Sequence, residues 1–219
     1  MRCDAPRWNL LPWADNYLRN AANAKAMTID LNDPVAVLLA ALQALEQAGV
    51  KAAAYGGLAL AVYGEPRETK DADLAVADVR AAQGEAALRA AGFDVILAFD
   101  RMRFGGQFVS RLTLIGGAAG SLNTADLVEP RSARYAHEVL ARSLTGSLRQ
   151  EPVLVVSPED FVVMKILATR ERDLEDAITV VRSLASDIDM DLIERELEAL
   201  AIEIPDHDIM GRWRRVQNR

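Results

Sequence analysis

The sequence predicts a mixed α/β fold, in which a mixed sheet is flanked by helices and followed by a helical C-terminal region. Within residues 28–156, short apolar segments bounded by Gly-containing turns alternate with segments whose apolar residues have helical spacing. From Ser157, helical spacing continues with few breaks to about residue 200. We therefore expect an N-terminal arm without a predictable structure at 1–27, an α/β domain at 28–156, and a helical region with a basic tail at 157–219.

The α/β part is predicted to open with a helix. Asp33 suits the N-cap, Pro34 suits the first turn, and Gly49 ends the apolar periodicity that follows. Further elements are expected as strands at 51–55, 71–76, 122–128 and 153–156, and as helices at 58–63 and from the N-cap Asp78 to Gly92.

Turn and cap residues mark the rest of the chain. Gly105-Gly106 and Gly116-Gly117 each fit a hairpin turn between predicted strands. Ser157 followed by Pro158 combines an N-cap with a first-turn proline, and therefore predicts the start of the C-terminal helices.

Length, charge and cysteine content restrict the class of protein. A chain of 219 residues can bury a core without a disulfide or a structural metal. Cys3 is the only cysteine and excludes an internal disulfide, and with only His137 and His207 it excludes the usual zinc ligand sets. The net charge of −7 disfavours a uniformly basic surface for nucleic acid. No apolar run approaches the ~18 residues of a membrane span and no signal peptide is recognisable, so we expect a cytoplasmic protein without a membrane partner.

A glycine pair and two carboxylates form the first part of a candidate active site. Gly56 and Gly57 stand at a predicted strand-to-helix turn, where backbone N–H groups can approach an anionic ligand closely. Asp71 and Asp73 are two residues apart on a predicted strand, so their carboxylates lie on one face and repel unless a cation or a proton intervenes. Oxygen-only ligands of this kind suit Mg²⁺ with bound phosphates.

Three further residues can complete this site. Arg67 and Thr69 add a cation and a hydroxyl at the entry to the strand that carries the two carboxylates. Asp126 is the only acid inside the predicted strand 122–128, a position that is costly for a carboxylate without a partner. If the two strands are neighbours, three carboxylates can hold two Mg²⁺ ions, one to activate an attacking hydroxyl and one to neutralise a triphosphate.

These residues, in this order, resemble the polymerase-β-type nucleotidyltransferase superfamily. The AbiEii-type toxins and their uncharacterised bacterial relatives are the most similar group, because they also carry a helical lysine followed by an Arg-Asp-x-x-Asp block. Here the lysine is Lys165 and the block ends at Asp176. The resemblance covers about residues 33 to 185, and it departs from many members of the superfamily in having Gly-Gly where they have Gly-Ser.

The resemblance implies an enzyme that transfers a nucleoside monophosphate from an NTP to a hydroxyl acceptor, with two Mg²⁺ ions. It implies that the catalytic and metal-binding residues are Asp71, Asp73 and Asp126. It implies that the nucleotide-binding residues are Gly56, Gly57, Arg67, Thr69 and Lys165. RNA (for example tRNA), protein and small molecules all stay open as the acceptor. A toxin paired with an antitoxin protein is one reading, and a catalytically silent NTP-binding or scaffold protein of the same fold is the alternative.

Simpler interpretations stay open for several residues. Asp126 could be a strand acid held by a neighbouring arginine, and Lys165 could extend along its helix to solvent. Arg172 and Asp176 lie four residues apart, so they are interpreted as helix support. The acids beside His207 could suggest a metal site, but we interpret this segment as a solvated part of an acidic tail.

Overall fold

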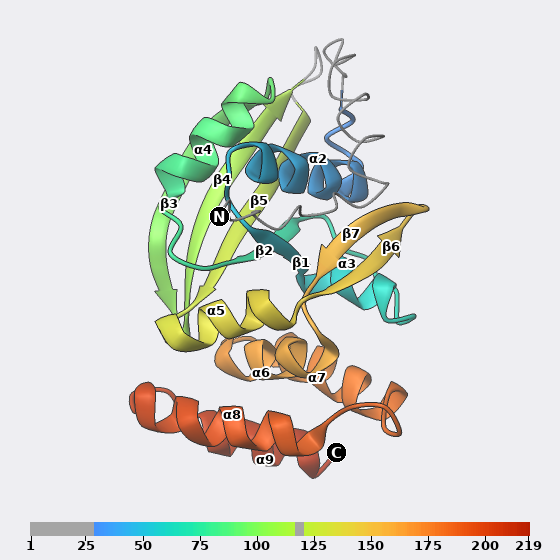
Figure 1. The fold of residues 1–219 in the computed structure, drawn as a ribbon, viewed down its shortest axis with the longest axis vertical. Helices are drawn as coiled ribbons and strands as arrows, with labels where there is room; N and C mark the ends of the chain where they lie inside the picture. Colours follow the sequence, from blue (N-terminus) through green and yellow to red (C-terminus); the bar gives the residue numbers. More distant parts are fainter. Residues whose placement is uncertain (1–28, 117–120) are drawn as a thin grey trace, which may run out of the picture.

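One mixed sheet organises the chain. The computed structural model describes residues 29–116 and 121–219, and within them seven strands follow the order β3-β4-β5-β2-β1-β7-β6 (Figure 1). The strands are β1 (Ala52–Tyr55), β2 (Ala72–Val76), β3 (Asp94–Phe104), β4 (Gln107–Gly116), β5 (Ser121–Pro130), β6 (Leu144–Leu148) and β7 (Glu151–Val155). The helices are α2 (Pro34–Gln47), α3 (Gly56–Val62), α4 (Ala81–Ala90), α5 (Ala133–Arg142), α6 (Pro158–Leu167), α7 (Glu171–Ser183), α8 (Met190–Glu203) and α9 (Ile209–Gln217). The predicted mixed α/β fold is confirmed, whereas the predicted arm at 1–27 and Gly117 lie outside the described residues.

The sheet combines parallel and antiparallel pairs around β2. This strand runs antiparallel to β1 and parallel to β5, with Asp73 opposite Asp126. Strands β3, β4 and β5 form an antiparallel meander, and β1 also pairs in parallel with β7. The pairing of β2 with β5 brings together two segments that are far apart in the sequence, and it positions the candidate site.

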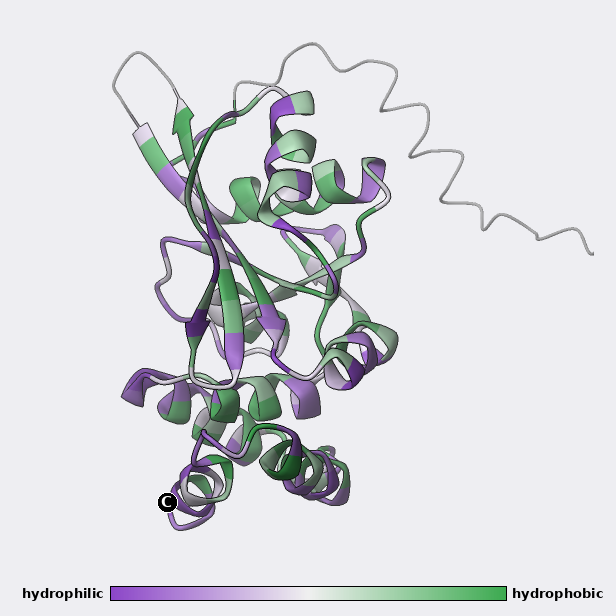
Figure 2. Ribbon diagram, turned by 90° about the vertical axis from the view of Figure 1, so that its left-hand side faces the viewer, coloured by the Kyte–Doolittle hydropathy of each residue, from purple (hydrophilic) through white to green (hydrophobic). Residues whose placement is uncertain are grey.

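Helices α2 and α4 cover one face of the sheet. Helix α2 contacts β1, β2 and β5, while α4 contacts β3 and β4. A Cβ atom on Gly84 of α4 would lie 2.8 Å from Leu127 and 3.2 Å from Leu112, so this helix rests directly on the strands. Because side chains alternate between the faces of a strand, Asp126 points to the face that α2 and α4 leave free. Figure 2 shows that the strands contain both hydrophobic and hydrophilic stretches.

The described chain after β7 is helical. Helices α6 and α7 pack together beneath the sheet, and α8 and α9 lie outside them (Figure 1). Ser157 caps α6 as predicted, since its hydroxyl accepts a hydrogen bond from the backbone N–H of Asp160 at 3.1 Å. Phe161 of α6 and Trp213 of α9 belong to the same buried cluster as the sheet, and the division at residue 156 into two parts stays a prediction. None of the helices in the described ranges is long and apolar enough to cross a membrane.

Two details differ from the sequence-based expectations. Helix α4 is preceded by Arg80, so the prediction of Asp78 as its cap is wrong. Asp78 has a φ of 57°, in the left-handed region, and its carboxylate lies 2.7 Å from Nε2 of His137. The chain therefore turns once more at Asp78 before the helix can begin. Helix α5 and strand β6 were not predicted from the sequence, although α5 buries an apolar stripe that includes Tyr135 and Val139.

Candidate active site

Two carboxylates predicted for the site lie side by side on neighbouring strands. Asp73 of β2 and Asp126 of β5 occupy the same register position in a parallel pair, so both side chains point to the same face. Asp71 precedes β2 by one residue and is two residues from Asp73. The expectation that the strand of Asp126 is a neighbour of the strand of Asp73 is confirmed.

The proximity of the three carboxylates changes the pKa of Asp73. Burial, followed by the negative charges of Asp126 and Asp71, raises the pKa of Asp73 to about 7. The cations Lys165 and Arg170 act in the opposite direction without cancelling the effect. A carboxylate in this setting gains from an additional cation, because the cation stabilises its charged form.

The glycine pair is packed against the side chains that the sequence associated with it. Gly56 has a φ of 64°, and a Cβ atom there would overlap the carboxylate of Asp73. A Cβ atom on Gly57 would lie 2.8 Å from Cβ of Thr69 and 3.1 Å from Nη1 of Arg67. Both positions therefore require glycine because other parts of the motif approach the backbone closely. The structure brings these five residues together.

Arg67 is held by an acid of the helical region. Its Nε and Nη2 donate to the two carboxylate oxygens of Asp176 on α7, at 2.9 Å and 2.8 Å. The predicted helix-support pairing of Asp176 with Arg172 is wrong, because Arg172 instead contacts the backbone carbonyl of Glu68. The contact ties the loop that carries Arg67 and Thr69 to the helices below the sheet.

Lys165 lies in the core and does not extend to solvent. It is 1% exposed, and its Nζ is 3.0 Å from Asp173 and 2.8 Å from Asp176. Burial alone would lower the pKa of Lys165, but the pKa is raised, because Tyr55, Asp173 and Asp176 favour the ammonium form. The ammonium also lies 5.3 Å from the centre of the Tyr55 ring, which is register-paired with Asp73. The positive charge of Lys165 favours the ionised form of Asp73. The predicted contact of Lys165 with phosphates stays a prediction.

Arg111 is a site residue that the sequence analysis did not name. It lies opposite Asp126 in the pairing of β4 with β5. Its Nε and Nη2 donate to the two oxygens of Asp126 at 2.8 Å and 2.7 Å. The simpler interpretation, an acid held by a neighbouring arginine, therefore describes this contact. The available signal was an arginine on a strand that pairs with the strand of the lone acid, but that pairing could not be read from the sequence.

Carboxylate oxygens are suitable ligands for a divalent cation, but these side chains are not gathered around a common point. Within residues 29–116 and 121–219, no group of three or more acidic, histidine or cysteine side chains is gathered as a metal site. Both oxygens of Asp126 already accept hydrogen bonds from Arg111. Asp71, Asp73 and Asp126 bring hard oxygen donors and an unfavourable concentration of negative charge to one face of the sheet. These donors fit Mg²⁺ once Arg111 releases Asp126.

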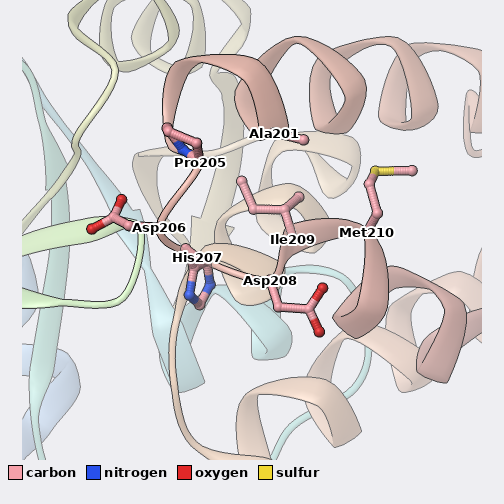
Figure 3. A pocket seen from close by; sticks show the side chains of 7 residues that line it. All are labelled: Ala201, Pro205, Asp206, His207, Asp208, Ile209 and Met210. Atoms are coloured by element: carbon pink, nitrogen blue, oxygen red, sulfur yellow. The ribbon is translucent and has the colours of Figure 1, made fainter.

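The acidic segment near the C-terminus makes internal contacts. Asp206, His207 and Asp208 line a shallow depression of 480 Å³ beside α8 and α9 (Figure 3). Asp206 pairs with Arg131 at 2.9 Å, and His207 Nε2 lies 3.1 Å from the carbonyl of Ile166. Asp208 caps α9. Asp206 and Asp208 are exposed, in line with the interpretation of a solvated segment, whereas half-buried His207 joins this segment to α6.

Comparisons with known proteins find distant similarity to several solved structures. No family model and no curated protein matches the chain. JHP933 from Helicobacter pylori matches with 15% identity and a TM-score of 0.48, over 77% of this chain and 75% of that one. A putative nucleotidyltransferase from H. pylori matches with 15% identity and a TM-score of 0.47, over 88% and 81%. The antibiotic-resistance factor ANT(2'')-Ia matches with 16% identity and a TM-score of 0.46, over 68% and 83%.

Proposed function

We propose that this protein is a nucleotidyltransferase that transfers a nucleoside monophosphate from an NTP to a hydroxyl acceptor. The observation that carries the proposal is the packing of Asp73 against Gly56, with Asp126 in register on the neighbouring strand. A glycine pair under a carboxylate cluster leaves backbone N–H groups beside acidic side chains, the combination needed to receive a triphosphate together with its cations.

The site residues divide between substrate and cation. Asp71, Asp73 and Asp126 would hold two Mg²⁺ ions, which supply charge neutralisation for the phosphates and lower the pKa of the attacking hydroxyl. Gly56 and Gly57 would offer backbone N–H groups to the triphosphate. The acceptor oxygen forms a bond to the α-phosphorus, the bond from that phosphorus to the bridging oxygen breaks, and pyrophosphate leaves with its electron pair. Asp126 would accept the proton of the acceptor hydroxyl.

The remaining predicted residues act around this centre. Thr69 covers Gly57 and would donate its hydroxyl to a phosphate oxygen, while Arg67 adds a positive charge at the same place. Lys165 would act on the phosphates through its charge, from within the core. RNA, protein and small molecules remain candidate acceptors, and an antitoxin is a candidate protein partner. Because NTPs are intracellular substrates, we propose a cytoplasmic location.

Incubation of the protein with each α-³²P-labelled NTP, Mg²⁺, and total RNA or total protein tests the proposal. We expect one macromolecular fraction, or a small-molecule extract, to become labelled by wild type and not by Asp73→Asn. Asp126→Ala should keep its affinity for the NTP and lose transfer, since its contact matters most in the transition state. Absence of labelling with every NTP and acceptor fraction, together with absence of NTP binding in a titration, would exclude the proposed function.

A second candidate is a catalytically silent NTP-binding protein of the same fold. The bidentate contact of Arg111 with Asp126 favours it, because a permanently occupied Asp126 could neither bind a cation nor accept a proton. This candidate predicts NTP binding by wild type without labelling of any acceptor.

A further inference from the structure

We infer that Arg111 competes with divalent cations for Asp126, so that a cation can occupy the site only when Arg111 releases this carboxylate. The inference rests on the proposed function, because it concerns the same three carboxylates. It assigns Arg111 a role of its own, as the residue that sets the cation affinity of the site.

The contact between Arg111 and Asp126 involves both carboxylate oxygens. The planar guanidinium donates to Oδ1 at 2.8 Å and to Oδ2 at 2.7 Å, the two-pronged geometry that matches arginine to carboxylate. Each oxygen keeps a second lone pair, but a cation bound there would lie close to the positive charge of Arg111. Simultaneous occupation by Arg111 and a divalent cation is therefore unfavourable.

The two partners differ in their freedom to move. The side chain of Asp126 is 8% exposed and sits on β5 between two paired strands, whereas that of Arg111 is 37% exposed. The guanidinium carbon of Arg111 also lies 5.7 Å from the centre of the Phe99 ring, on the neighbouring strand β3. Arg111 can therefore leave the carboxylate toward solvent and keep an aromatic contact, while Asp126 stays at its register position beside Asp73.

The balance of charges at the site also favours replacement of Arg111 by a cation. Asp71, Asp73 and Asp126 bring three acidic side chains to one face, and Arg111 forms two hydrogen bonds with one of them. Without a bound cation, Arg111 is the group that offsets this repulsion at Asp126. A divalent cation brings twice the charge to the same cluster and removes the need for Arg111 there.

A second ion pair in the same sheet provides a matched control. Arg101 pairs with Glu129 of β5, and their side chains are 27% and 6% exposed, close to the values for Arg111 and Asp126. Glu129 is three residues beyond Asp126 on the same strand and points to the opposite face. Loss of Arg101 removes one positive charge and one buried-acid partner without touching the candidate site.

Titration with Mn²⁺ alone, followed by electron paramagnetic resonance of the free ion, measures the competition. We expect Arg111→Gln to bind Mn²⁺ about 10- to 100-fold more tightly than wild type, because a charge-assisted bidentate contact no longer has to be broken. Arg111→Lys keeps the positive charge but loses the bidentate guanidinium geometry. Its Mn²⁺ affinity should therefore lie between those of wild type and Arg111→Gln. Arg101→Gln should bind Mn²⁺ as wild type does. Circular dichroism establishes that each variant is folded, and Arg111→Lys carries the test if the glutamine variant is not.

The outcomes separate this inference from the proposed function. Equal Mn²⁺ affinity of wild type, Arg111→Gln and Arg111→Lys, lost in Asp73→Asn, would mean that the cation site exists and that Arg111 does not compete for it. Absence of Mn²⁺ binding in every variant would overturn both proposals. Binding by Arg111→Gln alone would support the inference and favour the catalytically silent candidate.

Discussion

The carboxylate of Asp73 lies directly against the α-carbon of Gly56, where no other residue type would leave room for it. This contact joins the first helix turn after β1 to the strand that carries the candidate catalytic acids. It also gives Gly56 two separate reasons to be glycine, a φ of 64° and the absence of a side chain.

Substitution of Gly56 by alanine should destabilise the protein more than the backbone conformation alone requires. Gly64 is the matched control, because it has a φ of 91° with no neighbouring atom within 4 Å of a Cβ position. We expect Gly64→Ala to lower the free energy of unfolding by about 1–2 kcal/mol, the cost of a left-handed residue. Gly56→Ala should lose a further ~1–3 kcal/mol through overlap with Asp73. Urea unfolding measures both free energies. Equal losses in the two variants would show that the close contact of Asp73 with Gly56 does not contribute.

Neutralisation of Asp73 should stabilise the protein and abolish binding of Mg²⁺–NTP. Its pKa is raised to about 7 by burial and by Asp126, so Asp73→Asn relieves a charge that is unfavourable at neutral pH. In EDTA we expect the free energy of unfolding to rise by about 1–3 kcal/mol. Calorimetric titration with Mg²⁺–ATP or Mg²⁺–GTP should show binding to wild type only.

Asp78→Asn is the control for the substitution of Asp73. Asp78 is an exposed acid just beyond the same strand, and its substitution should change neither stability in EDTA nor nucleotide binding. If Asp73→Asn bound Mg²⁺–NTP as tightly as wild type, the assignment of Asp73 to the cation site would be wrong.

Truncation of Lys165 should unfold the protein at a much lower denaturant concentration. The change to alanine leaves Asp173 and Asp176 without the ammonium that both contact, and breaking a buried ion pair in this way costs about 3–5 kcal/mol. Lys70→Ala, at an exposed position beside the motif, should change stability by less than ~0.5 kcal/mol. Denaturant melts measure both.

The same variant tests the nucleotide contact predicted for Lys165. If the ammonium stabilises bound phosphates, NTP affinity measured below the melting transition should fall by about 1.5–3 kcal/mol. Unchanged affinity in folded Lys165→Ala would assign this lysine to the core alone.

Acidification should weaken the attachment of α9. Burial lowers the pKa of His207 despite its contact with the carbonyl of Ile166, and the nearby charges of Arg212 and Arg131 act in the same direction, against Asp206. The folded state then binds fewer protons than the unfolded chain, so stability is complete above the unfolded pKa of about 6.5 and is lost as the pH falls below it. Unfolding free energies between pH 7.5 and pH 5 should show a decline in wild type that is reduced in His207→Gln. His137→Gln, at the exposed second histidine, should keep the full decline.

The sequence was most informative where a local pattern determines a local structure. Asp33 caps α2 by accepting hydrogen bonds from Val35 and Ala36, and Ser157 caps α6, because the cap and the helix it serves are a few residues apart. Asp78 failed as a cap for the opposite reason. Its backbone conformation and its contact with His137, 59 residues away, depend on packing that the sequence does not display.

By itself, the sequence determined the mixed α/β fold, the glycine pair and the identity of the acids, because spacing along the chain specifies strands, turns and helices. The tertiary structure alone decided which strands are neighbours. The pairing of β2 with β5 placed Asp126 beside Asp73, and the pairing of β5 with β4 placed Arg111 on Asp126. It also turned Lys165 into the buried partner of two acids on another helix. Contacts between distant segments follow from the burial of the sheet by its helices, and that burial is a property of the whole chain.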